Sequence, residues 1–393
     1  MDFTLTTTQH ELLAKATWLA RECLAPRAAQ YDTTGRHPRE SWHDLWQHGF
    51  LSIAVPAAYG GGDLDMLTYV MVLERLTQGC TNTTMTLHMH SVVQRYIEAL
   101  ASPAQKAAYY PEVVEQGKLF GSWGSEPERR GGSGVSETTI APHGAGYMIR
   151  GRKHFCTMAG GAHRYLVHCA MVQGAGSAGG LQMALVPHDA PGLQVTSEWN
   201  TLGMRATVSP SVTFEDCYVS QDALLGTPGQ PATVGVSQGF GLGYAAIYIG
   251  AAQRALDFTI AYCQEHQFEP EPVPLAHSVV VQRHVAEMSL ALEGARLVLY
   301  QSASQWASAS PSQRAVLAAR AKYLATEAAL AVTSRAHQTV GGRSVYCSYP
   351  LEQLFRDVRT STMMPPNLDK AMEIVGKAAL GLEEQGQLWH FAP

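Results

Sequence analysis

The chain has 393 residues, of which 46% are hydrophobic and 16% are charged, and its formal net charge is -5. This composition is typical of a globular protein of two to three domains and excludes a disordered chain. The small net charge and the lack of a dense basic cluster argue against nucleic acid as a main partner.

No apolar run reaches the roughly 18 residues that a membrane span needs. The acidic, polar start Met1–Leu5 has no signal-peptide pattern, so we expect a cytoplasmic protein without membrane contact. The seven cysteines contain no Cys-x-x-Cys pair, and the sixteen histidines show no metal-ligand spacing. Neither a disulfide framework nor a metal site is indicated.

Residues 1–117 are predicted to form an N-terminal α-helical domain. Apolar residues recur there at the spacing of three and four that is typical of amphipathic helices. One helix is expected over Thr83–Leu100 with Asn82 as its N-cap. A further helix is expected over Ala104–Gly117, and we expect Pro111 to interrupt it.

Residues 118–228 are predicted to form a small middle β domain. Short β-rich runs alternate there with turns, and the small-residue stretch Gly174–Gly180 is expected to be a loop between two strands. The spacing indicates a compact barrel or sandwich. The β-rich runs are Leu119–Trp123, Gly146–Ile149, Tyr165–Met171, Gln182–Val186, Leu193–Thr196 and Ser211–Phe214.

Residues 229–393 are predicted to form a C-terminal helical bundle. Its long stretches are low in charge and rich in Ala, which suits close packing of helices. Some faces are too poor in polar residues for solvent, so we expect subunit contacts in a homodimer or homotetramer. The fold class is therefore α+β, with a β domain between two helical ones, and cofactor sites commonly form at such joins.

The stretch Met148–Gly161 is the first candidate for a binding site. A strand-like run enters a turn there, followed by an aromatic ring at Phe155, a hydroxyl at Thr157 and a glycine pair. Phe155 could lie against a flat ring, and Thr157 could donate a hydrogen bond to the edge of that ring. Glycines allow a close backbone approach. A strand that ends in a glycine turn is also a common structural feature.

Several segments, in order along the chain, resemble one family, the acyl-CoA dehydrogenases and their flavin monooxygenase relatives. The likeness runs from near residue 5 to near residue 385. The segments that carry it are Val55-Pro56-x-x-Tyr59-Gly60-Gly61, Trp123-Gly124-Ser125-Glu126-Pro127, Gly151-x-Lys153-x-Phe155-x-Thr157, Leu202-Gly203-Met204-Arg205-Ala206-Thr207 with Val212-x-Phe214-Glu215-Asp216-x-x-Val219, and Gln338-x-Val340-Gly341-Gly342 with Pro350-Leu351-Glu352-x-Leu354-x-Arg356-Asp357-x-Arg359.

The resemblance implies an FAD cofactor. It implies that Trp123, Gly124 and Ser125 lie along the isoalloxazine, with Phe155 and Thr157 beside it and Thr157 near the flavin N5. Family members use Trp at the position of Phe155. It further implies that a neighbouring subunit brings three residues to the adenine or pyrophosphate part, namely Gln338, Gly341 and Gly342.

This chain departs from the family at the catalytic base. Family dehydrogenases use a carboxylate to remove the α-proton of a thioester, and the residue at the usual Glu position here is Pro365. Some relatives carry the base on the helix after the β domain, at a position that falls near Phe240, where no carboxylate stands. Neither family position therefore supplies a base.

His90 is our candidate for an atypical catalytic base. It lies on the helix that lines the substrate cavity in relatives, and an imidazole with a pKa near ~6.5 can serve as a base. Monooxygenases of the dibenzothiophene type resemble this chain at the same place and in the run Lys153–Cys156. A buried core or interface histidine is the alternative for His90 and for its neighbour His88.

Three functions stay open at this point. The first is an FAD-dependent dehydrogenase that introduces an α,β double bond into an acyl-CoA or an acyl-carrier-protein thioester, with an electron-transfer flavoprotein as its partner. The second is a monooxygenase that uses reduced flavin and O₂ and depends on a flavin reductase. The third is a non-catalytic homologue that keeps the fold for assembly.

Overall fold

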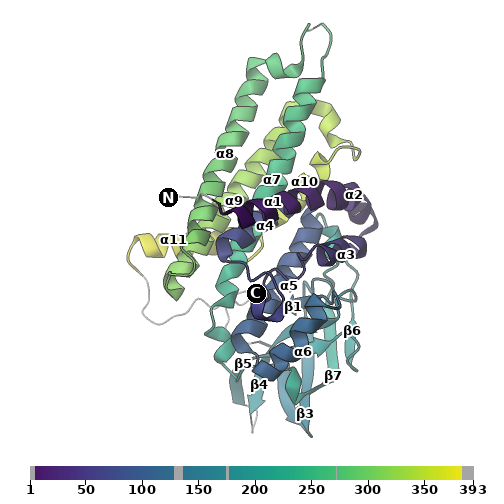
Figure 1. Ribbon diagram of the computed structural model, residues 1–393, viewed down its shortest axis with the longest axis vertical. Coiled ribbons are helices and arrows are strands. Elements are labelled where there is room, and N and C mark those ends of the chain that lie inside the picture. The colour runs from purple at the N-terminus through teal and green to yellow at the C-terminus, as the bar shows by residue number, and fades with distance from the viewer. Residues whose placement is uncertain (1–4, 128–135, 174–176, 271, 383–393) are drawn as a thin grey trace.

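The chain runs from helices through a sheet to helices again. The computed structural model describes residues 5–127, 136–173, 177–270 and 272–382. Figure 1 shows the long C-terminal helices at one end of the molecule and the sheet at the other, with the N-terminal helices between them. The predicted α+β fold class is confirmed. Among the described residues, no helix is both long and apolar enough to cross a bilayer.

The N-terminal helices begin at a capping box, in which the Thr6 side chain accepts from the backbone of Gln9. Pro111 lies inside α6 and does not interrupt it, because Tyr110 and Val113 on either side are buried in the core and hold the helix. The bounds are α1 Thr7–Leu19, a π-helical turn Ala20–Leu24, α2 Ala25–Thr34, α3 Arg39–Gln47, α4 Met66–Thr77, α5 Thr81–Leu100 and α6 Pro103–Val114.

Helix α5 is capped by Cys80, whose sulfur accepts from the Thr83 backbone, and not by Asn82 as we expected. Asn82 lies inside the first turn, with its amide group hydrogen-bonded to other parts of the chain. The helix is buried along most of its length. Its position between the sheet and the C-terminal helices makes α5 the central element of the molecule.

The middle domain is one eight-stranded sheet with the strand order β6-β7-β3-β2-β4-β5-β8, and β1 pairs with β4 off this path. Residues 177–180 of the expected glycine-rich loop belong to β5, and 174–176 lie outside the described residues. The bounds are β1 Phe120–Trp123, β2 Thr139–His143, β3 Gly146–Lys153, β4 Arg164–Gln173, β5 Ser177–Pro187, β6 Leu193–Val195, β7 Val212–Ser220 and β8 Leu224–Leu225.

A buried ion pair holds the end of β1 against β3. Lys153 Nζ donates to Glu126 Oε1 at 2.7 Å and to the Gly124 carbonyl at 3.1 Å, and both charged side chains are fully buried. The carboxylate also accepts from the Ser136 hydroxyl and the Thr138 backbone. Burial acts to raise the pKa of Glu126, but the charge and hydrogen bond of Lys153 lower it to about 2.

The C-terminal bundle consists of α7 Phe240–Glu265, α8 Val279–Ser304, α9 Pro311–Val340, α10 Leu351–Arg359 and α11 Leu368–Ala379. Helices α7 and α9 are almost continuously buried on their Ala-rich faces. Helix α8 leaves large apolar side chains exposed, namely Val279, Val280, Leu290 and Leu297.

We predict that Glu126→Gln lowers the free energy of unfolding by about 3–5 kcal/mol at pH 7, because it leaves the Lys153 ammonium buried without a counter-charge. A carboxylate with a lowered pKa stabilises the fold above its unfolded pKa, and that contribution is lost as the pH falls through the folded value. The difference between variant and wild type should therefore shrink between about pH 4.5 and pH 2.

Urea unfolding followed by circular dichroism measures this difference at each pH. The control is Glu373→Gln on α11, which removes two exposed ion pairs, with Lys370 and Lys377, and should change the stability by less than about 1 kcal/mol. A pH-independent difference for Glu126→Gln would contradict the assignment of an ionised, buried pair.

Candidate functional site

The loop after β3 presents an exposed aromatic ring. Phe155 is 56% exposed and has a φ of +53°, a left-handed conformation that is uncommon for a bulky residue. Its ring lies 4.2 Å from the His154 ring and 6.2 Å from that of Trp199, measured between centroids. A strained, outward-facing aromatic is a feature of binding sites, because folding alone does not favour it.

Thr157 stands beside this ring with a hydroxyl that can donate. Ser209 donates to Thr157 Oγ1 at 3.0 Å, so the proton of Thr157 remains available for a bond elsewhere. The Thr157 carbonyl accepts from the Trp123 indole at 3.0 Å, which anchors the loop to β1. Phe155 and Thr157 together form a face with an apolar ring and a hydrogen-bond donor, which we call the β wall.

The indole of Trp123 does not reach the surface of the β wall. It is buried in the sheet domain and stacks on Tyr165 with a centroid distance of 3.7 Å. Trp123 is 1% exposed as a whole residue, backbone included, so its place along a flavin stays a prediction. Gly124 and Ser125 follow it, partly exposed, with the Ser125 carbonyl accepting from the His154 backbone at 2.8 Å.

Gln338, Gly341 and Gly342 lie at and beyond the C-terminal end of α9. The Gln338 side chain accepts from Arg335 at 2.6 Å. Both glycines are exposed, and a Cβ added to either would meet nothing within 4 Å. Nothing in the described part of this chain packs closely against them, so these glycines are open to a second molecule.

Helix α5 has two functional faces, because residues three and four apart share a side of a helix. His90 and Gln94 face the sheet. His90 Nδ1 accepts from the Phe120 backbone at 2.9 Å, and Nε2 lies 2.7 Å from Gln94 Nε2. Burial lowers the pKa of His90 to about 4, so its ring is neutral at pH 7. These contacts make His90 a link between α5 and β1.

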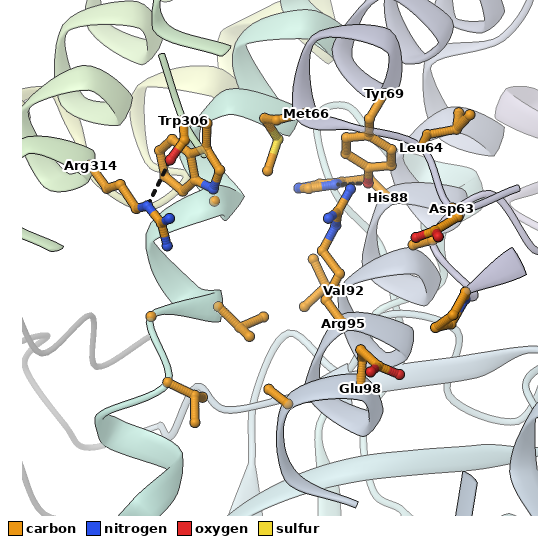
Figure 2. Close-up of a pocket in the computed structure, with 17 residues that line it drawn as sticks. Asp63, Leu64, Met66, Tyr69, His88, Val92, Arg95, Glu98, Trp306 and Arg314 are labelled. Atoms are coloured by element: carbon orange, nitrogen blue, oxygen red, sulfur yellow. Dashed lines mark hydrogen bonds between the residues drawn. The ribbon is translucent and has the colours of Figure 1, made fainter. Parts of the chain in front are cut away.

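The opposite face of α5 lines a cavity of about 270 Å³. His88, Val92 and Arg95 stand on this face, at a spacing of four and three residues along the helix. Figure 2 shows these side chains across the cavity from Trp306 and Arg314. Sequence reasoning missed these last two residues, which lie at the end of α8 and the start of α9, because their distance along the chain hides their proximity.

His88 forms a pair with Tyr69 of α4, whose hydroxyl lies 2.8 Å from His88 Nδ1. His88 Nε2 is buried without a hydrogen-bond partner among the described residues. The ring fits only because residue 243 is a glycine, whose Cβ would lie 2.1 Å from His88 Cε1. Burial lowers the pKa of His88 to about 3; the nearby Phe240 carbonyl acts in the opposite direction but forms no hydrogen bond of normal geometry with the ring.

The cavity contains no buried carboxylate among the described residues that line it. Its acidic residues, Asp63 and Glu98, are both exposed. Glu98 is also paired with Lys106 at 2.8 Å. Pro365 is partly buried at the end of the segment that follows α10 and offers no proton acceptor. The described residues also contain no group of three His, Cys, Asp or Glu side chains suited to a metal.

Three family models match the chain. They are described as acyl-CoA dehydrogenase N-terminal domain over residues 6–117, middle domain over 123–217 and C-terminal domain over 242–364. The human mitochondrial short-chain specific acyl-CoA dehydrogenase is 31% identical over 355 residues, which cover 90% of this chain and 85% of that protein.

Solved structures of both kinds of relative have the same fold. Butyryl-CoA dehydrogenase from Megasphaera elsdenii is 25% identical to this chain. The two structures superpose with a TM-score of 0.89, over 97% of this chain and 100% of that one. FMN-bound TdsC, a dibenzothiophene monooxygenase from Paenibacillus sp. A11-2, is 26% identical to this chain. The two structures superpose with a TM-score of 0.89, over 98% of this chain and 100% of TdsC.

The two histidines of α5 should differ in their contribution to stability. His90→Ala is expected to lower the free energy of unfolding by about 2–4 kcal/mol, since it leaves the Phe120 N–H buried without an acceptor and opens a hole. His88→Gln should cost less, about 1–2 kcal/mol, because His88 is as buried as His90 but a glutamine amide can keep the hydrogen bond to the Tyr69 hydroxyl. Urea unfolding of both variants measures the difference, and equal losses would contradict the two-faced description of α5.

Proposed function

The chain belongs to the acyl-CoA dehydrogenase family, and on that premise we propose that it introduces an α,β double bond into an acyl thioester with FAD as the hydride acceptor. Members of this family are flavin-dependent oxidoreductases. The thioester is carried by CoA or by an acyl carrier protein. The observation that carries the proposal is the β wall, whose exposed ring and free hydroxyl suit a flavin.

The residues of the β wall fit FAD. The exposed ring of Phe155 offers an apolar surface to the isoalloxazine, and the hydroxyl of Thr157 has a proton to donate to its N5 edge. The carbonyls of Gly124 and Ser125 accept from Lys153 and the His154 backbone, which ties these two residues to the start of the loop that carries the β wall. When bound, FAD supplies a two-electron acceptor for hydride.

The proton step needs a base among the residues of the cavity, because Pro365 cannot act as one. We predicted His90, and that assignment remains a prediction. The contacts favour His88, since His88 Nε2 has no hydrogen bond among the described residues, whereas His90 Nδ1 accepts from the Phe120 backbone, so that Nε2 of that neutral ring already carries a proton. In this step His88 Nε2 takes the α-proton, the β-hydrogen leaves as hydride, and the Cα–Cβ bond becomes double.

A flavin-dependent monooxygenase is the second candidate. TdsC has the same fold over nearly the whole chain. The run Lys153–Cys156, which we identified as similar to that branch, forms one edge of the β wall. This activity would use reduced flavin and O₂ and would need a flavin reductase, whereas the dehydrogenase would pass its electrons to an electron-transfer flavoprotein.

We also propose that the protein assembles as a homodimer or homotetramer. The support is the exposed apolar surface of α8 together with Val345 and Tyr346, which follow the exposed glycines after α9. A neighbouring copy placed there would bring Gln338, Gly341 and Gly342 to the FAD of its partner. Glycines allow phosphate oxygens to approach backbone N–H groups closely.

The visible spectrum of the purified protein tests the proposed activity. We expect bound yellow flavin that bleaches anaerobically when an acyl thioester is added. His88→Gln should slow this bleaching by about 100-fold or more, the usual contribution of a positioned base. If His90→Ala, corrected for its stability, shows the larger loss, the base is His90. Bleaching only by a flavin reductase, with oxygen incorporation into product, would replace the proposal with the monooxygenase.

Gly342→Ala tests the role of the neighbouring subunit. The added Cβ meets nothing within 4 Å in its own chain, so the unfolding midpoint should stay nearly unchanged. FAD retention on a desalting column should fall, because the new methyl group blocks a partner's cofactor. Gly376→Ala on α11, equally open, is the control that should retain FAD. Equal retention by both variants would contradict this role.

A further inference from the structure

Arg95 is partly buried in the cavity wall, and two of its N–H donors point into buried space without a hydrogen-bond acceptor among the described residues. Its Nε and Nη2 atoms are buried and have no partner, and the described residues provide no ion pair for it. The guanidinium carbon lies 4.7 Å from the centroid of the Tyr69 ring, so the cation is held in place by a π-face. Such a contact orients the group but satisfies neither of its N–H donors.

The neighbouring charged groups are used elsewhere or are exposed. Asp65 accepts from the Thr68 backbone and hydroxyl as the N-cap of α4. Glu98 is paired with Lys106, and Asp63 is exposed at the rim. The charges of Asp63 and Asp65 attract the guanidinium from a distance, but neither carboxylate accepts a hydrogen bond from it. Burial lowers the pKa of Arg95, although these two charges act to raise it.

The two free donors lie on the same edge of the guanidinium. Nε–H and Nη2–H of an arginine are parallel and match the two oxygens of a carboxylate in a bidentate pair. Figure 2 shows Arg95 pointing into the cavity near Tyr69 and His88, across from Arg314. Arg314 donates from Nε to the Trp306 carbonyl and from Nη2 to the Ala307 carbonyl, which uses two of its five N–H donors, and its charge adds to the positive field of the cavity.

We propose that Arg95 binds a carboxylate on the acyl group of the substrate, so that the preferred substrate class is the thioester of a short dicarboxylic acid. This inference rests on the proposed dehydrogenase function. The cavity of about 270 Å³ has room for a short acyl chain and has Val92 and Met66 as apolar walls. A carboxylate there satisfies both orphan donors, which a neutral acyl chain leaves buried and unpaired.

Direct binding of a small anion tests the site without any turnover. The probes are valerate, which carries one carboxylate on a short chain, and its neutral amide, valeramide. Isothermal titration of the flavin-loaded protein should show that wild type binds valerate and binds valeramide at least about tenfold more weakly. Arg95→Met should lose the preference for valerate, and Arg95→Lys should keep part of it as a point charge.

The matched control is Arg21→Met, which removes an exposed guanidinium from another part of the molecule and should bind valerate as wild type does. Arg95→Met should fold at least as stably as wild type, because it removes an unpaired buried charge. Equal valerate affinity in Arg95→Met and wild type overturns the inference, and so does an absence of valerate binding to wild type.

Turnover separates this inference from the proposed function. Wild type should have a higher kcat/KM for glutaryl-CoA than for valeryl-CoA, and Arg95→Met should lower this ratio by about 10- to 100-fold. If valeryl-CoA is oxidised as well as glutaryl-CoA, the dehydrogenase stands and the carboxylate site is overturned. If no thioester is oxidised, the proposed function fails while the valerate titration still decides the role of Arg95.

Discussion

The three parts of the chain meet at one buried carboxylate. Asp357 of α10 accepts from the Met204 backbone at 2.6 Å and from the Asn82 amide of α5 at 2.9 Å. Asn82 in turn accepts from the Ala206 backbone at 2.9 Å. Burial raises the pKa of Asp357 to about 7, and these donors act in the opposite direction. The segment that they hold leads to Ser209, which orients the Thr157 hydroxyl. The β wall therefore depends on a junction between domains as well as on its own strand.

Helix α5 transmits this arrangement to the cavity. The side chains at 90 and 94 bind β1 and the loop before α4, while those at 88, 92 and 95 face the open space. A rotation of the helix that moved one set would move the other, because both are fixed to the same backbone. The sheet that carries the proposed flavin face and the cavity that would hold an acyl group are thus placed relative to each other by a single rigid element.

The sequence was enough to predict the α–β–α order and most of the strands, because these depend on local patterns and on glycine turns, but strand β2 and helix α10 were not predicted. The binding role of Phe155 and Thr157 stays a prediction. The sequence was not enough for features that depend on distant partners. Asn82 has the right chemistry for a cap, but its amide finds Asp357 far along the chain. Trp123 could not be oriented, since all four residues of β1 are buried and no alternation marks its faces. For His90, the sequence placed the residue on the correct helix, but only the contact with Phe120 shows which face it occupies.

Three buried or partly buried cations of this fold differ in whether the chain provides them with a hydrogen-bond acceptor. Lys153 is fully buried with the Glu126 carboxylate as its partner. Lys322 is buried and, among the described residues, donates to the Ser361 carbonyl at 2.7 Å; burial lowers its pKa to about 8, so a small part of its charge is lost near neutral pH. A guanidinium cannot lose its charge in this way, because its pKa stays far above neutrality. Arg95 must therefore remain a cation with two N–H donors that have no acceptor. This arrangement destabilises the fold, and no contact among the described residues offsets the loss. An unpaired donor of this kind is expected where a ligand supplies the missing acceptor. Arg95 therefore indicates the chemistry of the substrate more directly than His88, which has a hydrogen bond to Tyr69.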